Sequence, residues 1–448
     1  MRVAVIGAGI VGVTTAYELA CDGHDVTVYE RRGSVAAETS FANAGVVAPG
    51  YVTPWAAPGM PGKVLRSLFS AHGPVRLAPG LSPATLRWIW RWWRACNPGA
   101  YAARRTSMQR LALFSRERLH QITEALQLEY ERSQGLLVLL RNPKDLAMAQ
   151  AGLVVLDQLG IKHRVLEAEG CRTVEPGLNA DMPLHAGVHL PDDEVGNCRQ
   201  FAHLLRTESQ QRGVRFRFHT EVERLVPGAT PQLVTRATVS DESGPLTKNV
   251  DPSRAGFAPT QPMVIEPVAE TADAIVVCAA IGSAALLAPH GLKLPLAPVY
   301  GYSVTAPIRQ HEHHPDRGPR SGVMDEQYKV AISRIGSRVR VAGCAELGGS
   351  PSRHNAAAME TLYKVLHDWY PGVAQLTHAQ RWKGARPMLP DGPPVLGRSG
   401  IEGVWLNLGH GSSGWALACG SARVLADLLA SRRAPVDTAG LGIERLHH

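Results

Sequence analysis

The sequence predicts an α/β protein in which a Rossmann-like nucleotide-binding domain is combined with an α+β second domain built on an antiparallel sheet. The first observation is an apolar strand segment, Arg2 to Ile6, which leads directly into the glycine-rich segment Gly7 to Gly12 and a helical run. The second is another strand segment, which ends at Glu30. The third is that strand segments and glycine-rich turns return near the middle and the end of the chain, which predicts that both domains are discontinuous.

Length and composition describe an ordered globular chain of two or three domains, with 448 residues, 45% of them hydrophobic and 19% charged. The net charge of +8 is mild and forms no Lys-rich tail or basic run, so we expect no nucleic-acid partner. The seven cysteines form no C-x-x-C pair, which favours reduced thiols in the cytoplasm. No apolar stretch reaches the roughly 20 residues of a membrane-spanning helix.

The N-terminal glycine pattern has the spacing G-x-G-x-x-G between a strand and a helix. Gly7 permits the tight turn, Gly9 leaves no side chain between the backbone and a pyrophosphate, and Gly12 lets the helix approach the strand closely. The free N–H groups and the positive dipole end of the helix face the phosphates. The predicted contacts with a dinucleotide in this segment are Gly7, Gly9, Ile10, Val11 and Gly12.

The second strand, Asp25 to Tyr29, ends at an acidic residue. The Glu30 carboxylate is placed to accept hydrogen bonds from a ribose, and an acid at this position favours a ribose without a phosphate. The register of strand, helix, second strand and Glu30 predicts a dinucleotide site, but it does not separate FAD from NAD.

The segment after Glu30 favours a flavin. Arg31, Arg32 and Gly33 open a polar loop that continues to Gly45, and this loop resembles the cofactor loop of D-amino-acid-oxidase-like FAD enzymes. Residues 40–61, SFANAGVVAPGYVTPWAAPGMP, resemble the D-amino acid dehydrogenase (small subunit) family of these FAD-dependent oxidoreductases. Similar segments follow in the family's order at 196–201, 298–303, 325–334, 386–392 and 408–415, so the resemblance covers nearly the whole chain.

The resemblance implies an FAD in an extended pose, with adenine, ribose and pyrophosphate on the N-terminal βαβ unit. It implies that Arg31, Ser40, Asn43, Ala44 and Gly45 lie beside the pyrophosphate and the flavin, that the backbone of Val222 reads the adenine edge, and that Ala279 follows a strand leading back to the cofactor. Two departures stand out. Ala280 replaces a glycine that is common in the family, and the segment 227–270 is longer than the usual hairpin, so we expect an extended surface loop there.

A late glycine-rich turn follows the apolar strand Val404 to Leu408 and enters a helix from Trp415 to Leu429. The start of that helix can stabilise negative charge on a reduced flavin, although a plain strand-to-helix turn is the alternative. The predicted cofactor contacts here are Gly409, Gly411, Ser412, Ser413 and Gly414.

Substrate recognition is predicted from four residues. Arg386 supplies the bidentate fork that a substrate carboxylate requires, and similar arginines in the related enzymes bind that carboxylate; a structural salt bridge is the alternative. Tyr302 and Tyr328 either offer hydroxyls to the substrate or are ordinary packed tyrosines. His410 either takes part in catalysis or has a capping or packing role.

We predict no metal site, since His311, Glu312, His313 and His314 read as a polar loop without periodicity. The segment Leu86 to Arg94 is an amphipathic helix with Arg87, Arg91 and Arg94 on one stripe. Its tryptophans suit either a membrane interface or inward packing. We therefore expect a cytoplasmic protein, either free or peripheral on the inner face of the cytoplasmic membrane.

The predicted FAD-binding domain comprises 1–56, 197–296 and 381–448, and the substrate domain comprises 57–196 and 297–380. The predicted reaction is oxidation of a D-amino acid by hydride transfer from Cα to flavin N5, giving a 2-oxo acid and ammonia, with electrons passed to a quinone or another acceptor partner. The alternatives are an O₂-dependent oxidase of D-amino acids or of cyclic imino acids such as D-proline or hydroxyproline, and a non-catalytic flavin-binding module. The sequence does not predict an oligomeric state.

Overall fold

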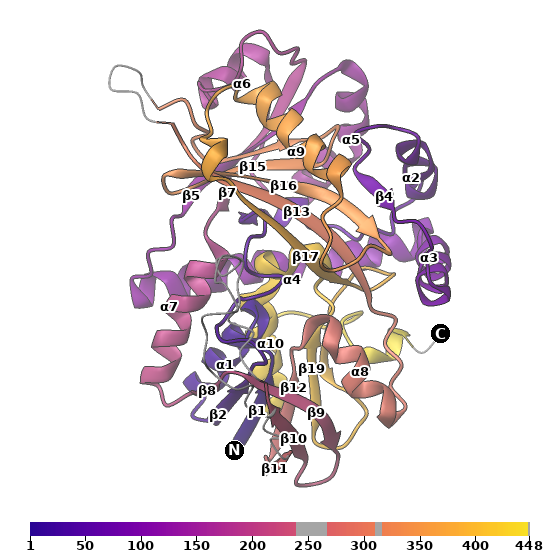
Figure 1. Ribbon diagram of the computed structural model, residues 1–448, viewed down its shortest axis with the longest axis vertical. Coiled ribbons are helices and arrows are strands. Elements are labelled where there is room, and N and C mark those ends of the chain that lie inside the picture. The colour runs from indigo at the N-terminus through magenta and orange to yellow at the C-terminus, as the bar shows by residue number, and fades with distance from the viewer. Residues whose placement is uncertain (239–266, 310–315, 447–448) are drawn as a thin grey trace, which may run out of the picture.

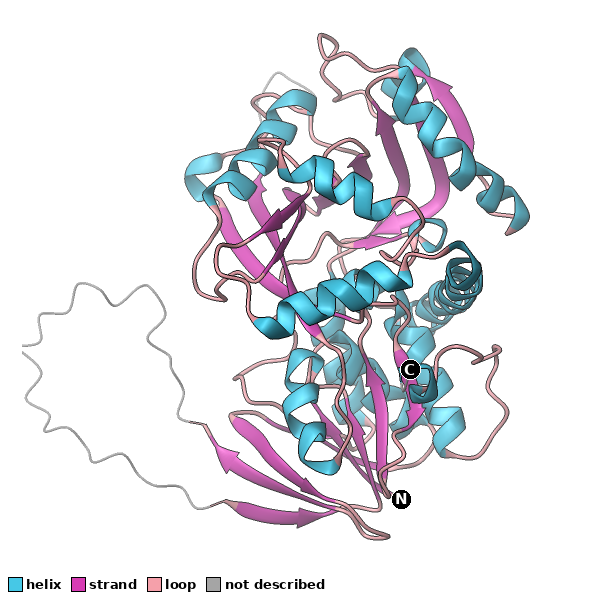
Figure 2. Ribbon diagram, turned by 90° about the vertical axis from the view of Figure 1, so that its right-hand side faces the viewer, coloured by secondary structure: helices cyan, strands magenta, loops and turns pink. Residues whose placement is uncertain are grey.

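The computed structural model describes residues 1–238, 267–309 and 316–446 (Figure 1). Two sheets lie one above the other in this view, each with its own helices, and both termini belong to the lower part (Figures 1 and 2). The strand-then-helix alternation that the N-terminal sequence predicts is confirmed by β1 (Arg2–Ile6), α1 (Ile10–Cys21) and β2 (Asp25–Tyr29).

The lower sheet has the strand order β18-β19-β12-β1-β2-β8. Its neighbours are parallel except for β18 and β19, and its central strands are buried on both faces, as is usual for a parallel sheet between two layers. The strands that join β1 and β2 come from distant segments: β8 (Arg215–Arg217), β12 (Ala274–Val277), β18 (Val395–Arg398) and β19 (Val404–Leu408).

Helices cover one face of this sheet, where α1 packs with α7 (Cys198–Gln211), α10 (Gly414–Leu429) and the long α4 (Pro98–Leu126). The other face is covered by α8 (Ser283–Leu287) and by a three-stranded sheet, whose strands are β9 (Thr220–Val226), β10 (Gln232–Ala237) and β11 (Val268–Thr271). The expectation of an extended loop over 227–270 is therefore wrong at both ends, because β10 and β11 pair there; residues 239–266 lie outside the described part of the chain.

The upper sheet has the order β17-β13-β16-β15-β14-β5-β7-β3, with β4 and β6 pairing at its sides. It is mostly antiparallel and supports α9 (Ala356–Trp369) on one face. Its strands are β3 (Val46–Val47), β4 (Val75–Leu77), β5 (Ser133–Leu140), β6 (Arg164–Glu167), β7 (Ala186–Val195), β13 (Ala297–Pro307), β14 (Gly322–Asp325), β15 (Val330–Ile335), β16 (Arg338–Leu347) and β17 (Gln380–Met388). The remaining helices α2 (Met60–Leu68), α3 (Pro83–Ala95), α5 (Pro143–Gln158) and α6 (Ala168–Val174) lie around this sheet (Figure 1).

Sheet membership divides the chain differently from the predicted domain bounds at two strands. Strands β3 and β17 come from segments that we expected in the FAD-binding domain, yet both belong to the upper sheet. The physical reason is pairing: β17 runs antiparallel to β13 along its full length, and β3 pairs with β7. Both strands are continuous along the chain with segments of the lower layer, because β3 follows the 31–45 loop and β17 leads into β18.

The face of the upper sheet opposite α9 rests on the loop that follows the cofactor-binding motif. Ser303 Oγ donates to the Ala42 carbonyl at 2.8 Å, Arg340 Nη1 to Asn43 O at 3.0 Å, and Ser333 Oγ to Ala44 O at 2.7 Å. Three adjacent strands therefore hold three consecutive carbonyls, which fixes this loop between the layers. No helix in the described residues is long and apolar enough to cross a membrane.

Candidate cofactor and substrate site

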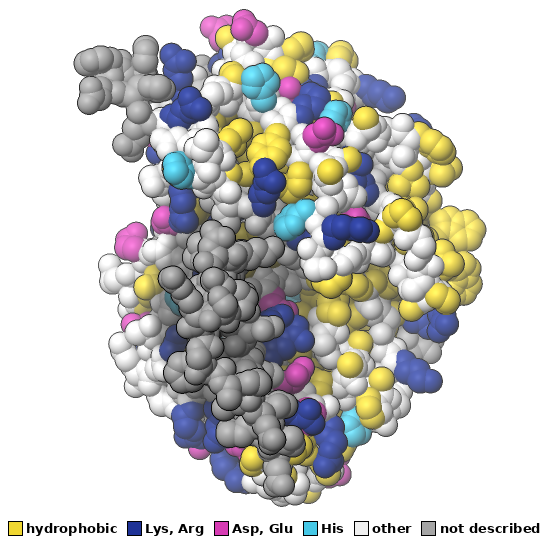
Figure 3. Space-filling view, viewed as in Figure 1, with side chains coloured by type: hydrophobic (Ala, Val, Ile, Leu, Met, Phe, Trp, Pro, Cys, Tyr) yellow, Lys and Arg dark blue, Asp and Glu magenta, His cyan; other side chains and the backbone are white. Residues whose placement is uncertain are grey.

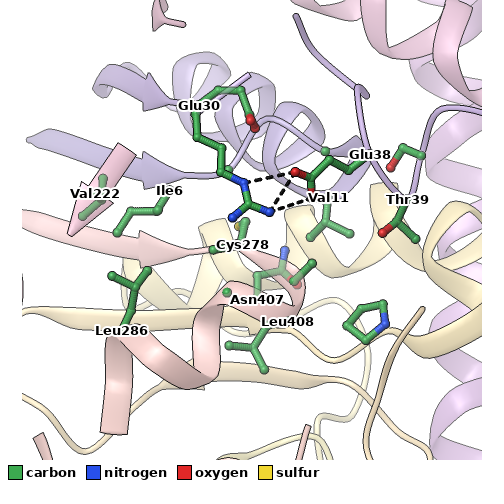
Figure 4. Close-up of a pocket in the computed structure, with 18 of the residues that line it drawn as sticks. Ile6, Val11, Glu30, Glu38, Thr39, Val222, Cys278, Leu286, Asn407 and Leu408 are labelled. Carbon is green, nitrogen blue, oxygen red and sulfur yellow. Dashed lines mark hydrogen bonds and ion pairs between the residues drawn. The ribbon is translucent and has the colours of Figure 1, made fainter. Parts of the chain in front are cut away.

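A cavity of about 510 Å³ lies at the carboxyl ends of the parallel strands, where open α/β sheets bind their ligands (Figure 4). Its wall is contributed by segments that are far apart in the sequence. The predicted cofactor residues that line it are Gly7, Gly9, Ile10, Val11, Glu30, Arg31, Ser40, Val222, Ala279, Gly409, Gly411 and Gly414. The others, Gly12, Asn43, Ala44, Gly45, Ser412 and Ser413, are not part of its lining.

The glycine turn at the start of α1 has the geometry that its spacing predicts. Gly7 has φ +100°, and a side chain on Gly12 would collide with the Gly7 carbonyl group, which explains why the helix can approach the strand only with glycine there. Gly9 caps α1 without any side-chain hydrogen bond, while Ile10 N–H donates to Ser40 Oγ at 3.1 Å. The start of α1 therefore presents backbone N–H groups to the cavity, as anion sites at helix N-termini do.

Glu30 closes one side of the cavity. Its carboxylate accepts from the N–H of Ala8 and from the N–H of Arg32, both at 2.8 Å. Burial raises the pKa of Glu30, although both backbone hydrogen bonds oppose that shift. Each oxygen keeps a free lone pair, so the carboxylate can still accept from a hydroxyl group.

The two ends of the cavity differ in polarity. In Figure 4 Val222, Ile6 and Leu286 line one end, whereas Glu38 and Thr39 lie toward the other. An apolar slot of this kind suits the faces of a purine ring, while the polar end suits a group that needs hydrogen-bond partners.

Arg31 is not free to neutralise a phosphate. Its Nε and Nη2 donate to Glu38 Oε1 at 3.1 and 2.8 Å, and Arg32 donates to the same oxygen at 2.8 Å. Burial would raise the pKa of Glu38, but these two arginines outweigh it and lower the pKa. The ion pairs of Arg31 and Arg32 with Glu38 therefore hold the 31–40 loop in place beside the cavity.

Asn43, Ala44 and Gly45 form the support of the site. Gly45 has φ +77° and its Cα faces the Gly196 carbonyl so closely that a Cβ would be 2.7 Å from that oxygen. Its own carbonyl accepts from Trp415 Nε1 at 3.2 Å, while Asn43 Oδ1 accepts from the Gly45 N–H at 3.0 Å. This loop is fixed from both sides, by the sheet above and by α10 below.

The late glycine turn leads into α10 as predicted. Gly409 and Gly411 have φ +77° and +57°, and a Cβ at Gly411 would be 2.6 Å from Met388 Sδ. Ser412 and Ser413 form a short 3₁₀ turn before α10, and the helix cap at Ser413 makes no side-chain hydrogen bond. The first turn of α10 is therefore a second helix start near the cavity that can face negative charge.

Arg386 lies on β17, beside the strand β13. Its Nη1 donates to the Cys344 carbonyl at 2.8 Å, and burial lowers the pKa of the guanidinium to about 10, which still leaves it charged at neutral pH. Within the described residues it makes no ion pair with a carboxylate. The salt-bridge alternative is thus not found in the described part of the chain, and the charge remains available to an anion.

Tyr302 and Tyr328, like Arg386, are not part of the lining of this cavity, and a contact of either tyrosine with the substrate stays a prediction. Tyr302 is fully buried on the α9 face of the sheet, where its hydroxyl donates to Glu346. Tyr328 packs on the same domain with the Arg141 guanidinium 4.9 Å and Lys364 Nζ 5.3 Å from its ring centre. Alternation along β13 directs Tyr302 away from Ser303, which faces the cofactor loop, and these contacts favour the alternative of ordinary packed tyrosines.

His410 is part of the cavity wall, but its ring is held by the core. Burial lowers the pKa of His410 to about 3, so the imidazole is neutral. Ser421 Oγ donates to Ala418 O at 3.1 Å and therefore accepts from His410 Nε2 at 3.0 Å. This favours the packing alternative for His410 over proton transfer.

Sequence reasoning missed several residues of the wall. Thr39 Oγ1 donates to the Ala385 carbonyl at 2.7 Å, which ties the 31–40 loop to the strand of Arg386. Asn407 is a fully buried amide in the apolar strand VWLNL, and that polar residue was the available signal. Ala280 also lines the cavity and has φ +47°, the conformation that the expected glycine would favour.

The described residues contain no group of His, Cys, Asp or Glu that could hold a metal ion. The His311 to His314 segment lies outside the described residues.

Comparison with known proteins fixes the class. A family model described as FAD dependent oxidoreductase matches residues 2–428. The chain therefore belongs to the family of FAD-dependent oxidoreductases. The features of the cavity fit an FAD: an uncapped helix start for a pyrophosphate, a carboxylate for a ribose, an apolar slot for adenine, and a buried amide oxygen of Asn407 without a partner in the described residues.

The particular relatives are D-amino acid dehydrogenases, which confirms the resemblance seen in the sequence. The enzyme of Cereibacter sphaeroides is 44% identical over 447 residues, covering 99% of this chain and 95% of that protein. That of Rhizorhabdus wittichii is 40% identical, covering 99% and 100%. Among solved structures, glycine oxidase from Geobacillus kaustophilus has a TM-score of 0.70 at 18% identity, covering 99% of this chain and 98% of that one, and shares the fold. L-proline dehydrogenase from P. horikoshii has a TM-score of 0.68 at 15% identity, covering 99% and 93%.

Proposed function

We propose that the protein catalyses the FAD-dependent oxidative deamination of D-amino acids to 2-oxo acids and ammonia. The observation that carries the proposal is Arg386, a partly buried cation without a carboxylate partner in the described residues. Arg386 itself does not line the cavity, but the next residue on its strand, Pro387, does. The full-length similarity to D-amino acid dehydrogenases supports it. Bound FAD supplies the hydride acceptor, N5, and the protein's residues supply the binding and the orientation.

Arg386 binds the substrate carboxylate through its fork and so fixes one end of the amino acid. The hydrogen bond from Thr39 to Ala385 holds that strand against the cofactor loop, which fixes the distance between the carboxylate site and the flavin site. A neutral His410 is not a proton acceptor of suitable pKa, so a neutral substrate amine, desolvated at the site, loses hydride without a dedicated side-chain base.

The experiment that tests this proposal is anaerobic bleaching of the bound flavin. Purified protein should be yellow and release FAD, not FMN, on denaturation. D-amino acids should reduce the flavin while their L-enantiomers should not. Bleaching only by cyclic imino acids such as D-proline would change the substrate class, and no bleaching by any amine would leave a non-catalytic flavin-binding module.

The proposal includes the electron acceptor: a quinone or a partner protein rather than O₂. The specific support is an exposed apolar surface on α2, β4 and α3, which we call the α2–α3 surface. Its members are Leu65, Phe69, Leu77, Leu86, Trp90 and Trp93, and Phe69 is 87% exposed. Figure 3 shows hydrophobic side chains gathered at the edge where Figure 1 places these helices. Such a concentration of exposed apolar residues is typical of a partner or membrane contact.

The sequence segment that carries the α2–α3 surface is basic, although Arg110 and Arg116, on α4, are paired with Asp437 and Asp193. No Asp or Glu occurs between Glu38 and Glu117, whereas this stretch contains ten Lys and Arg residues. These basic residues are Lys63, Arg66, Arg76, Arg87, Arg91, Arg94, Arg104, Arg105, Arg110 and Arg116. Trp and Arg side chains together suit the headgroup region of an anionic bilayer, so we propose peripheral contact with the cytoplasmic membrane, where quinones reside.

The sequence left two alternatives for the tryptophans of α3, a membrane interface and inward packing, and the structure has two tryptophans in each position. Trp88 and Trp92 pack inward, while Trp90 and Trp93 are half exposed or more. Trp88 Nε1 donates to the Met388 carbonyl at 3.1 Å, two residues beyond Arg386. Trp88 and Trp92 hold α3 against the strand that carries Arg386, and Trp90 and Trp93 remain exposed for contact with a partner.

Vesicle binding tests the membrane part of the proposal. The protein should bind vesicles containing anionic phosphatidylglycerol at low salt and be released at high salt, because each basic residue near the surface contributes about 1 kcal/mol. Trp90→Ser with Trp93→Ser, or Arg87→Glu with Arg91→Glu, should abolish binding and leave dye-linked turnover intact. Val154→Ser, at an exposed apolar position on α5, is the control and should bind as wild type does. Indifference to anionic vesicles together with stoichiometric peroxide formation would instead indicate a soluble O₂-dependent oxidase.

A further inference from the structure

Asn407 is a buried carboxamide in an otherwise apolar strand. On β19, the neighbouring Leu406 and Leu408 pack on the face of the sheet that α8 covers, whereas Trp405 packs on the α1 face. Alternation places Asn407 on the α1 face as well, at the end of the strand that borders the cavity. Burying an amide is costly unless its hydrogen bonds are made, so its partners identify its role.

The orientation of the amide is fixed by Thr15 of α1. The Thr15 hydroxyl donates to the Val11 carbonyl at 2.7 Å and so uses its only hydrogen there. Toward Asn407 it can only accept, and Asn407 Nδ2 donates to it at 2.9 Å. The NH₂ group is therefore directed to Thr15, and Oδ1 takes the other direction.

Asn407 Oδ1 is buried and has no hydrogen-bond partner among the described residues. A buried acceptor of this kind needs a donor, and because Asn407 lines the cavity a bound molecule can supply it. Phosphate oxygens are acceptors and cannot fill that role, and the apolar slot at Val222 is at the far end of the cavity (Figure 4). In the same view Asn407 lies between that end and the end with Thr39, next to Val11 at the start of α1.

We propose that Asn407 Oδ1 accepts a hydrogen bond from a hydroxyl group of the ribityl chain of FAD. This inference rests on the proposed function, because it assigns a residue to the proposed cofactor. Among the parts of FAD, the ribityl chain joins the pyrophosphate to the flavin and bears hydroxyl donors, and Asn407 lines the cavity together with Val11 at the helix start and Gly409 of the late glycine turn. Asn407 is thus a polyol-recognising residue, distinct from the ribose acceptor Glu30.

The test compares FAD with ADP, which lacks the ribityl chain, on full-length protein from which the flavin has been removed. Asn407→Leu and the smaller Asn407→Ala should each weaken FAD binding about three- to tenfold, as loss of one neutral hydrogen bond does. Their affinity for ADP, measured by calorimetry, should stay within twofold of wild type. An equal loss for FAD and ADP in both variants would mean that Asn407 only positions the glycine turn, and would overturn the inference.

A second arm uses wild-type protein and needs no variant to fold. FAD analogues lacking single ribityl hydroxyls should include one that binds wild type about three- to tenfold more weakly than FAD does. The same analogue should bind Asn407→Ala no more weakly than FAD binds that variant. Absence of this coupling for every analogue would also overturn the inference. If wild-type protein binds ADP but not FAD, the proposed cofactor fails as well; if FAD binds and only the coupling is absent, this inference alone fails.

Discussion

The guanidinium of Arg386 lies across Gly301 on the adjacent strand, so closely that a Cβ on Gly301 would be 2.5 Å from Arg386 Cζ. The strands β13 and β17 pair at this level, with Gly301 opposite Gly384. A residue without a side chain is therefore what allows the arginine to lie flat over the sheet. The position of Arg386, the proposed carboxylate-binding residue, therefore depends on Gly301, which has no functional group of its own.

Gly301→Ala should consequently displace Arg386. We expect KM for the D-amino acid to rise at least tenfold with FAD content unchanged, because a shift of about 1 Å in a substrate-binding group is sufficient for such losses. Gly152→Ala in α5 is the control, since nothing lies within 4 Å of a Cβ there. Wild-type kinetics in Gly301→Ala would contradict the assignment of Arg386 to the substrate.

Arg386→Lys keeps the positive charge and removes the fork. The expected loss is about 1.5–3 kcal/mol of substrate binding, roughly a 10- to 150-fold rise in KM, with the flavin spectrum preserved. Steady-state kinetics with a reactive D-amino acid provide the measurement. Arg381→Lys, on the same strand but exposed and paired with Tyr363, should behave as wild type does.

His410 should make stability fall as the pH is lowered. Its pKa is about 3 in the folded protein against 6.5 ordinarily, so between these values the unfolded chain binds a proton that the folded protein does not. The free energy of unfolding then decreases by about 1.4 kcal/mol for each pH unit below 6.5. Urea unfolding at pH 7 and 5 should show a smaller decrease in His410→Gln than in wild type, while exposed His367→Gln should keep the wild-type difference.

Glu18 joins three helices beneath the cofactor motif. This fully buried carboxylate of α1 accepts from Arg118 of α4 at 2.6 and 3.0 Å and from Arg423 of α10 at 2.9 Å. Glu18→Gln leaves two arginines without their shared anion. Because both arginines are partly exposed, we expect a loss of about 2–3 kcal/mol in the free energy of unfolding rather than more. Glu117→Gln, at an exposed position on α4, should lose less than 0.5 kcal/mol, and an equal loss in both variants would refute the role of the three-helix junction.

The sequence predicted what depends on local geometry. The turn at Gly7 and the approach at Gly12 follow from residue spacing within one βαβ unit, and both have the predicted conformation. Glu30 lines the cavity at the end of β2, and its contact with a ribose stays a prediction. The turn at Gly409 follows the same logic. Local patterns of this kind are reliable because the chain itself supplies both partners.

What the sequence could not predict depends on partners far along the chain. The alternation along β13 is regular, but the sequence alone does not reveal which face of that strand α9 covers, and Tyr302 lies on the α9 face. Tyr328 follows β14 in a turn, where no alternation applies. The division of tryptophans on α3 depends on Met388, three hundred residues away. We expected β17 in the FAD-binding layer because nothing in the sequence shows that this strand pairs with β13.

The order of strands in the lower sheet has a consequence for synthesis on the ribosome. Val3 pairs with Val26 of β2, which is made at once, but its neighbour on the other side is Ala274 of β12, and β12 in turn pairs with β19 through Ile275 and Val404. Contacts of such long range close slowly. The helix start at Gly414 comes later still. We therefore expect nascent chains to gain flavin only after near-complete translation, with one edge of the strand Arg2 to Ile6 unpaired until β12 has been made and dependent on chaperones in the interval.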